Sequence, residues 1–364
     1  MENRDNPIII IGAGPAGLTA AYELSRGGRK VLVLEQYQHG QIGPDGHSKL
    51  CGGGLVPLSR SYLGEDIENK LENKNFIAKT GNIIARVKLD FSAVTTLDRE
   101  DLINFLTHKA VKAGASVRFG AKVATIDLKD KLIMVGREKI PFFALIGADG
   151  ANSIVRHALG LEKSEKFLQA VEYRVPRNKI NSLLAVHFDY DLFAGGYAWV
   201  FPHKKEVYIG ACEPFVTRRR KKKNLVDDLK EWIRRENLPY NSETLRGWTI
   251  PYSFQGYRFP GSVYLVGDAA GITSGFLGEG ISSAIASGHD VANLIIDPSF
   301  RPVNINQSLR IKSRQEKFLA VCCRSPILGR FLIKTAVWMA STKIFLPLAL
   351  WFYNLNKAEM NIDG

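Results

Sequence analysis

Residues 8–17 read Ile8-Ile9-Ile10-Ile11-Gly12-Ala13-Gly14-Pro15-Ala16-Gly17. A continuous apolar run before a glycine-rich turn is typical of a buried parallel strand, and residues 18–26 continue in a helical pattern. Residues 30–35 then predict a second strand with Glu35 at its tip, 18 residues beyond Gly17. Strand, glycine turn, helix, strand and acid in this order predict a dinucleotide-binding βαβ unit.

Each residue type in this unit has a physical task. Gly12 allows a tight turn, Gly14 lets a pyrophosphate approach the backbone, and Gly17 lets the helix pack closely on the strand. The helix N-terminus offers free N–H groups and a partial positive charge to the phosphates. Glu35 can accept hydrogen bonds from a ribose diol.

Composition excludes several classes of protein. The chain has 364 residues, of which 45% are hydrophobic, so it can form a core and is not mainly disordered. No short repeat period occurs, which excludes collagen-like and coiled-coil chains. The four cysteines form no C-x-x-C or Cys/His ligand spacing, so we expect neither a disulfide framework nor a bound metal. The first strand follows no secretory signal pattern, so we expect a cytoplasmic location.

The formal net charge of +13 is concentrated in two segments, residues 218–223 and residues 301–364. The basic run at 218–223 has no interleaved aromatic residues and accompanies no nucleic-acid motif, so we expect no nucleic-acid partner. A solvated loop or helix start is the ordinary explanation for such a run.

The apolar C-terminal stretch at residues 326–353 is interrupted by Arg330, Lys334, Lys343 and Pro347. No uninterrupted part reaches the roughly 20 residues that span a bilayer, so we expect no transmembrane helix. Two interpretations stay open. The stretch either lies peripherally on the inner face of the cytoplasmic membrane, with its aromatic residues at the headgroups, or forms helices packed on the body of the protein.

Two further strand-to-helix turns follow the first. Residues 142–150 end in Asp149-Gly150, and residues 262–268 end in Gly267-Asp268, from which the chain runs on to Gly278-Glu279-Gly280-Ile281. Each turn alone is compatible with an ordinary helix start. Together with the first turn, their order resembles the flavoprotein monooxygenase and reductase superfamily, with a glutathione-reductase-type FAD fold. The resemblance therefore implies FAD as the dinucleotide.

The resemblance implies a role for other residues by motif position. Arg99 matches an arginine near the FAD phosphates; a surface residue at a helix start is the alternative explanation. Residues Gly275 to Gly280 would lie against the pyrimidine edge of the flavin, and a helix beginning near Gly280 would direct its positive end at the flavin. The implied cofactor-binding set is Gly12, Gly14, Ala16, Gly17, Glu35, Gln36, Cys51, Gly52, Gly53, Arg99, Asp149, Gly267, Asp268, Gly278, Gly280 and Ile281.

The middle of the chain, residues 165–251, shows strand alternation around one helix at about 225–236 and predicts an antiparallel sheet over the cofactor. Within it, Tyr197, Trp199 and Phe201 alternate and are expected to share one strand face, as ordinary core residues would also do. Residues 197–202 resemble the Y-x-W-x-F-P motif of the geranylgeranyl reductase family. Cys51-Gly52-Gly53 resembles the Cys-Gly-Gly loop of that family.

This second resemblance implies that reduced FAD saturates carbon–carbon double bonds of a prenyl chain, with the hydride coming from flavin N5. The electron donor is NAD(P)H or ferredoxin, and the substrate is a prenyl lipid or isoprenoid. Implied substrate-binding residues are Tyr197, Trp199, Phe201 and Pro202, and Cys51, Tyr197 and Trp199 are the candidate catalytic residues. His203 is a further candidate proton donor. Cys212 departs from the family pattern, which has glycine there, and residues 272–277 lack its Asn-Pro.

The expected fold is α/β: a Rossmann-like FAD-binding domain, an inserted antiparallel substrate domain and a helical C-terminus. We assign residues 1–75, 97–165 and 258–300 to the first, 76–96 and 166–257 to the second, and 301–364 to the third. Two alternatives stay open: an FAD-dependent aromatic hydroxylase using NAD(P)H and oxygen, and a non-catalytic membrane-docked flavoprotein. A flavin halogenase is disfavoured, because its W-x-W-x-I-P signature is not matched.

Overall fold

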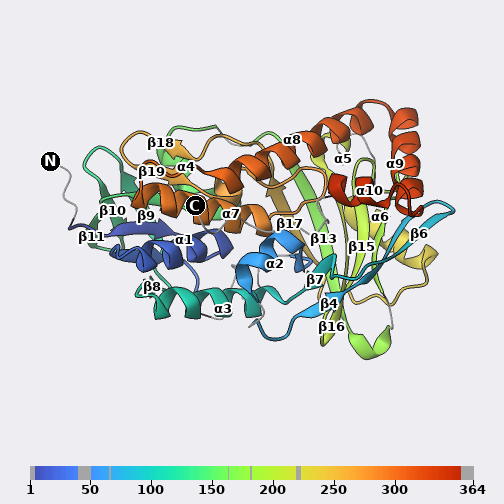
Figure 1. Ribbon diagram of the computed structural model, residues 1–364, viewed down its shortest axis with the longest axis horizontal. Helices are drawn as coiled ribbons and strands as arrows, with labels where there is room; N and C mark the ends of the chain where they lie inside the picture. Colours follow the sequence, from blue (N-terminus) through green and yellow to red (C-terminus); the bar gives the residue numbers. More distant parts are fainter. Residues whose placement is uncertain are drawn as a thin grey trace.

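The computed structural model describes residues 5–39, 51–64, 67–162, 164–180, 183–218 and 223–353. One half of the molecule is built on a six-stranded sheet (Figure 1, left). The strand order is β18 (Arg258–Phe259), β19 (Val263–Leu265), β12 (Leu145–Gly147), β1 (Ile8–Ile11), β2 (Val31–Leu34) and β8 (Ser116–Arg118). All pairs are parallel except the edge pair of β18 and β19. The carboxyl ends of β1, β12 and β19 therefore lie at the same edge, where ligands bind in open parallel sheets.

Three helices cover one face of this sheet: α1 (Pro15–Arg26), α3 (Arg99–Lys112) and α7 (Ile281–Ile296). Close packing of α1 on its neighbours depends on small residues. A Cβ at Gly17 would lie 2.1 Å from the Gly12 carbonyl oxygen, and one at Gly288 would lie 2.2 Å from the Ala16 carbonyl oxygen. On the other face lie α4 (Ile154–Ala158) and a three-stranded sheet of β9 (Val123–Asp127), β10 (Leu132–Val135) and β11 (Glu138–Pro141).

A seven-stranded sheet forms the other half (Figure 1, right). Its order is β17 (Arg246–Pro251), β13 (Phe167–Pro176), β16 (Glu206–Pro214), β15 (Tyr197–Pro202), β14 (Leu184–His187), β5 (Asn75–Thr80) and β6 (Ile83–Lys88). Helix α6 (Leu225–Arg235) packs Leu229, Trp232 and Ile233 against it, and the short α5 (Phe215–Arg218) contacts β13 and β16. The sheet is antiparallel except between β14 and β5, which are parallel; about 100 residues separate them, which leaves room for the crossover that a parallel pair requires.

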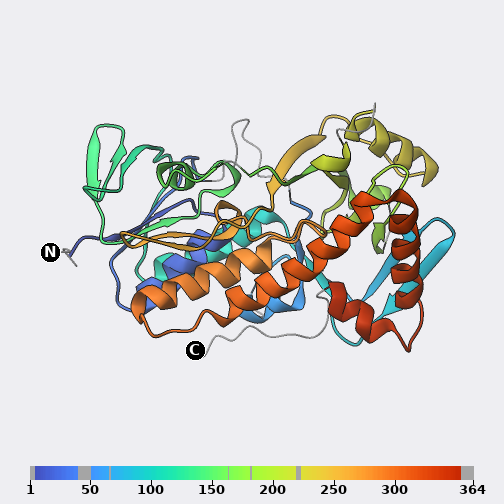
Figure 2. The ribbon, with the colours of Figure 1, turned by 90° about the horizontal axis from the view of Figure 1, so that it is seen from above.

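A third, small sheet of β3 (Gly54–Leu55), β4 (Leu71–Asn73) and β7 (Val94–Thr96) lies beside α2 (Pro57–Leu63) between the two halves. The chain then ends in α8 (Val303–Arg324), α9 (Pro326–Ala340) and α10 (Leu346–Tyr353). Figure 2 shows α8 running from α7 across to the seven-stranded sheet, where α9 packs on β5 and β6. Within the described residues, no helix is long and apolar enough to cross a membrane. The predicted α/β class, with an antiparallel sheet and a helical C-terminus, is confirmed.

Candidate active site

A cavity of about 600 Å³ runs from the carboxyl edge of the parallel sheet to the seven-stranded sheet and the C-terminal helices. It brings together most residues singled out from the sequence. Those that line it are Gly12, Gly14, Ala16, Glu35, Gln36, Cys51, Gly52, Gly53, Arg99, Asp149, Tyr197, Trp199, Phe201, Gly267, Asp268, Gly278, Gly280 and Ile281. Gly17 and Pro202 do not line it. Gly17 packs α1 closely against the Gly12 carbonyl, and the Pro202 carbonyl accepts a hydrogen bond from Thr96.

The glycine turn forms one end of the cavity. Gly12 has a φ of +105°, and a Cβ there would lie 2.4 Å from the Ala148 carbonyl oxygen, so the turn requires glycine. At Gly14 a Cβ would have only Arg99 Nη2 within 4 Å, at 3.9 Å, which leaves the backbone open to a ligand. Arg99 begins α3, and its buried Nε has no hydrogen-bond partner among the described residues.

Carboxylates surround this end in fixed positions. Glu35 accepts hydrogen bonds from the backbone N–H of Ala13 at 2.8 Å and of Tyr37 at 3.1 Å, which orients it at the end of β2. Asp268 accepts a hydrogen bond of 2.7 Å from the Thr273 hydroxyl. Burial raises the pKa of Asp149, whose Oδ2 accepts the backbone N–H of Ile154 at 2.7 Å.

The start of α7 forms the next part of the wall. Gly280 is its N-cap, and the preceding Glu279 accepts the backbone N–H of Ser282 at 2.8 Å. Burial raises the pKa of Glu279, and the Glu279 side chain lines the same cavity as Tyr197. Gly275 does not line the cavity, because the Tyr252 ring packs against it. Sequence reasoning missed Glu279; the available signal was an acid between two glycines at a predicted helix start.

The donor set fits a flavin dinucleotide. A glycine turn followed by a helix N-terminus suits a pyrophosphate, and the unpartnered nitrogen of Arg99 supplies a cation at the same place. Glu35, held by two backbone groups, keeps acceptor capacity for a ribose diol.

Aromatic side chains form the wall beyond this polar end. The rings of Tyr197 and Trp199 are 5.8 Å apart and those of Trp199 and Phe201 are 6.4 Å apart, so the three share one face of β15 as predicted. The Tyr197 hydroxyl donates to the Leu277 carbonyl, and Trp199 Nε1 donates to Glu172 Oε2 at 3.2 Å. These hydrogen bonds satisfy or orient the polar atoms and leave an apolar surface toward the cavity.

The loop that carries Cys51 is held from behind by His203. The Nε2 atom of His203 lies 3.1 Å from the Gly52 carbonyl oxygen, and Nδ1 lies 2.9 Å from Asp98 Oδ1. Asp98 also accepts a hydrogen bond of 2.8 Å from Tyr208, and the contact with His203 is the largest cause of its lowered pKa. His203 is 1% exposed and does not line the cavity, so in this geometry it positions the loop.

Some predictions lie outside the site or outside the described residues. Cys212 does line the cavity, paired with Tyr197 across β15 and β16. Residues 219–222 of the basic run lie outside the described residues. No group of three or more His, Cys, Asp or Glu side chains in the described ranges could hold a metal ion.

Comparison with known proteins also indicates an FAD-binding protein. The sequence profile of the FAD binding domain family matches residues 5–298. The chain is 30% identical over 305 residues to a geranylgeranyl diphosphate reductase of Rhodobacter capsulatus, covering 78% of this chain and 73% of that protein. The chain belongs to the geranylgeranyl reductase family of FAD-dependent oxidoreductases. It is thus an FAD-dependent oxidoreductase.

Two further similar proteins extend the comparison. A digeranylgeranylglycerophospholipid reductase of Methanocaldococcus jannaschii is 25% identical over 305 residues, covering 77% of this chain and 74% of its own. A crystal structure described as geranylgeranyl bacteriochlorophyll reductase-like, from Thermoplasma acidophilum, superposes with a TM-score of 0.72 at 22% identity. It covers 94% of this chain and 95% of that one. At that identity the superposition shows a shared fold.

Proposed function

We propose that this oxidoreductase reduces carbon–carbon double bonds in a prenyl chain of the geranylgeranyl type, carried on a lipid or an isoprenoid. One observation carries the proposal. Every cavity-lining residue contributed by the seven-stranded sheet and by α9 and α10 is uncharged. An isolated alkene has no polar handle, so a site for it must bind by apolar and aromatic contact. Two relatives, a geranylgeranyl diphosphate reductase and a digeranylgeranylglycerophospholipid reductase, support the same substrate class.

Each part of the chain has a separate task in this proposed function. Residues 1–75, 97–165 and 258–300 hold FAD, with the glycine turn and Arg99 at the pyrophosphate and Glu35 at the ribose. Residues 76–96 and 166–257 hold the prenyl chain on the Tyr197, Trp199 and Phe201 face. The C-terminal segment, assigned to residues 301–364, closes the far end through α9 and α10. When bound and reduced, FAD supplies a hydride from N5 to one alkene carbon, with NAD(P)H or ferredoxin as the donor that reduces it.

The protein must then exclude water and hold a proton for the second alkene carbon. Tyr197 is a weak acid here, because burial raises its pKa well above the usual value and its hydroxyl already donates to Leu277. Glu279 lines the same cavity, and burial raises the pKa of its carboxyl, which favours the protonated form. We assign the proton to the Glu279 carboxyl, with the Cys51 thiol as the alternative donor. The Gly52 carbonyl, held by His203, keeps the Cys51 loop in place.

The test is a single-turnover reduction without oxygen. The FAD-loaded protein is reduced with dithionite and mixed with geranylgeranyl diphosphate or a prenylated lipid extract. The masses of the reaction products are then measured by mass spectrometry. Gains of two hydrogens per double bond, together with flavin reoxidation, support the proposal. E279Q tests the proton assignment, since FAD reduction should be retained while product formation falls at least about tenfold.

Two outcomes would contradict the proposal. A lipid that binds but stays unsaturated would indicate a non-catalytic flavoprotein. Consumption of NAD(P)H and oxygen that an added aromatic compound accelerates would indicate a hydroxylase.

A further inference from the structure

Large apolar side chains are exposed on the C-terminal helices far more densely than elsewhere. Half of the sixteen exposed ones among the described residues lie between Ile327 and Trp351. On α9, Ile327, Phe331 and Trp338 follow helical spacing and are 81%, 63% and 49% exposed. In the turn after α9, Ile344 is 83% exposed, and Phe345 contacts the Trp338 ring at 5.9 Å. A contiguous apolar face of this kind marks an interaction surface.

Helix α10 has two apolar faces. Leu346, Ala349, Leu350 and Tyr353 follow the i, i+3, i+4, i+7 spacing of one helix face and line the cavity. Leu348 and Trp351 lie on the outer side and are each about half exposed. The outer surface and the end of the substrate cavity are therefore separated by the width of one helix.

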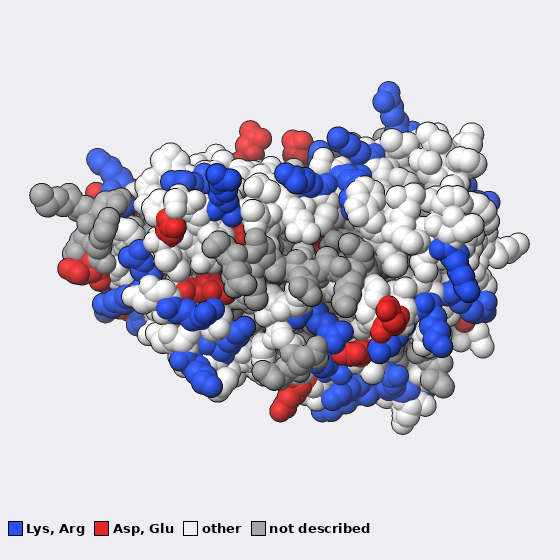
Figure 3. Space-filling view, viewed as in Figure 1, with Lys and Arg blue, Asp and Glu red and all other residues white. Residues whose placement is uncertain are grey.

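The C-terminal helices are predominantly basic. Between Val303 and Tyr353 the sequence has eight Lys or Arg residues and a single acid, Glu316, which pairs with Lys312. Lys334 lies on the exposed stripe of α9, and Lys343 precedes Ile344 in the turn; both are exposed. In Figure 3 the upper right end of the molecule, where α9 and α10 lie in Figure 1, is largely white with blue groups at its border.

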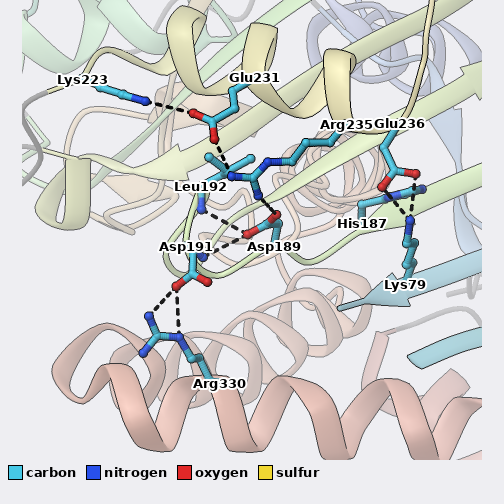
Figure 4. A network of polar contacts seen from close by, with 10 residues as sticks. All are labelled: Lys79, His187, Asp189, Asp191, Leu192, Lys223, Glu231, Arg235, Glu236 and Arg330. Atoms are coloured by element: carbon cyan, nitrogen blue, oxygen red, sulfur yellow. Dashed lines mark hydrogen bonds and ion pairs between the residues drawn. The ribbon is translucent and has the colours of Figure 1, made fainter. Parts of the chain in front are cut away.

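Polar contacts hold both helices in this position. Arg330 of α9 pairs with Asp191, which belongs to the loop between β14 and β15, and a network through Asp189 and Arg235 anchors that loop to α6 (Figure 4). On α8, Gln315 accepts a hydrogen bond of 2.6 Å from Ser274 and donates one of 3.1 Å to the Phe352 carbonyl. The apolar face is therefore presented by helices fixed to the body.

We propose that the outer face of α9, α10 and the turn between them docks on an anionic lipid bilayer. The face is defined by Ile327, Phe331, Trp338, Ile344, Phe345, Leu348 and Trp351, with Lys334 and Lys343 among them. Apolar side chains inserted at the headgroup boundary, together with lysines facing anionic headgroups, are the two components of interfacial binding. Docking in this orientation brings α10, and the cavity behind it, against the bilayer. The inference rests on the proposed function, because it identifies where that cavity meets a membrane-borne prenyl substrate.

The test measures binding and catalysis separately. Full-length FAD-loaded protein is sedimented with vesicles of phosphatidylcholine alone or with phosphatidylglycerol. The double variant I344N/L348N should bind anionic vesicles at least about tenfold more weakly than wild type. The matched control V111N, which changes a half-exposed apolar residue on α3, should bind like wild type. K334Q and K343Q should each weaken binding about fivefold on anionic vesicles and hardly at all on neutral ones.

Catalysis distinguishes this inference from the proposed function. I344N/L348N should reduce dispersed geranylgeranyl diphosphate at the wild-type rate and a vesicle-borne prenyl lipid much more slowly. If wild type reduces neither substrate, the proposed function fails, while vesicle binding still decides the docking surface. The docking proposal would be overturned if the wild-type protein did not sediment with anionic vesicles. It would also be overturned if I344N/L348N bound them as well as wild type. A dimer in sedimentation velocity that I344N/L348N converts to monomer would overturn it as well, since the face would then join two copies of the chain.

Discussion

Glu172 of β13 gives a quantitative prediction about the wall of the cavity. Its side chain is fully buried in the seven-stranded sheet; Oε2 accepts the Trp199 indole N–H at 3.2 Å, and Oε1 has no hydrogen-bond partner among the described residues. Burial raises the pKa of Glu172 to about 7, although the nearby Arg174 and the Trp199 hydrogen bond oppose the shift. The substitution E172Q keeps an acceptor for Trp199 and removes the charge.

The sign and size of the effect follow from linkage. A carboxyl whose folded pKa lies above its unfolded value of 4.5 binds more protons in the folded state, so the free energy of unfolding falls as pH rises between 4.5 and 7. A pKa raised from 4.5 to about 7 corresponds to about 3 kcal/mol when the transition is complete. We therefore expect wild type to lose about 2–3 kcal/mol of stability between pH 5 and pH 8 that E172Q retains.

Urea unfolding of the FAD-saturated proteins, followed by circular dichroism at a fixed FAD concentration, measures this difference. FAD must be held constant, because a ligand that binds the folded state adds its own stabilisation. The control is E206Q, which removes the partly exposed carboxylate that pairs with Arg174 at 3.9 Å and should change stability by less than about 1 kcal/mol. Parallel stability curves for wild type and E172Q from pH 5 to pH 8 would refute the assignment of a proton to Glu172.

Three further predictions concern the site. R99A should raise the dissociation constant of FAD about 10- to 100-fold, measured by flavin fluorescence, because it removes a charged group from the phosphate end; an unchanged constant would place Arg99 away from the phosphates. H203A should lower the free energy of unfolding by about 2–4 kcal/mol in urea, because removing the buried imidazole leaves a void and takes the hydrogen-bond partner from the half-buried Gly52 carbonyl; equal stability would show that His203 does not stabilise the loop. C212G should change which prenyl double bonds are reduced, as judged by mass spectrometry, and an identical product pattern would remove Cys212 from substrate selection.

The local sequence determined the cofactor half of the molecule. Strand β1, the glycine turn, α1 and Glu35 lie where the spacing predicts, because tight turns and close helix–strand contact leave few alternatives to glycine. The alternation of Tyr197, Trp199 and Phe201 likewise placed three rings on one strand face, since a strand has a period of two.

Contacts between distant segments were decided only by the tertiary structure. The roles of Glu279, of Glu172 behind Trp199, and of His203 behind the Cys51 loop depend on which elements meet, and local pattern does not encode this. The same holds for β5, whose parallel pairing with β14 joins segments about 100 residues apart. The C-terminal sequence left membrane contact and packing as alternatives. The tertiary structure packs one apolar side of α9 and of α10 on the protein. The other apolar side of each helix is exposed to solvent, where the membrane proposal applies.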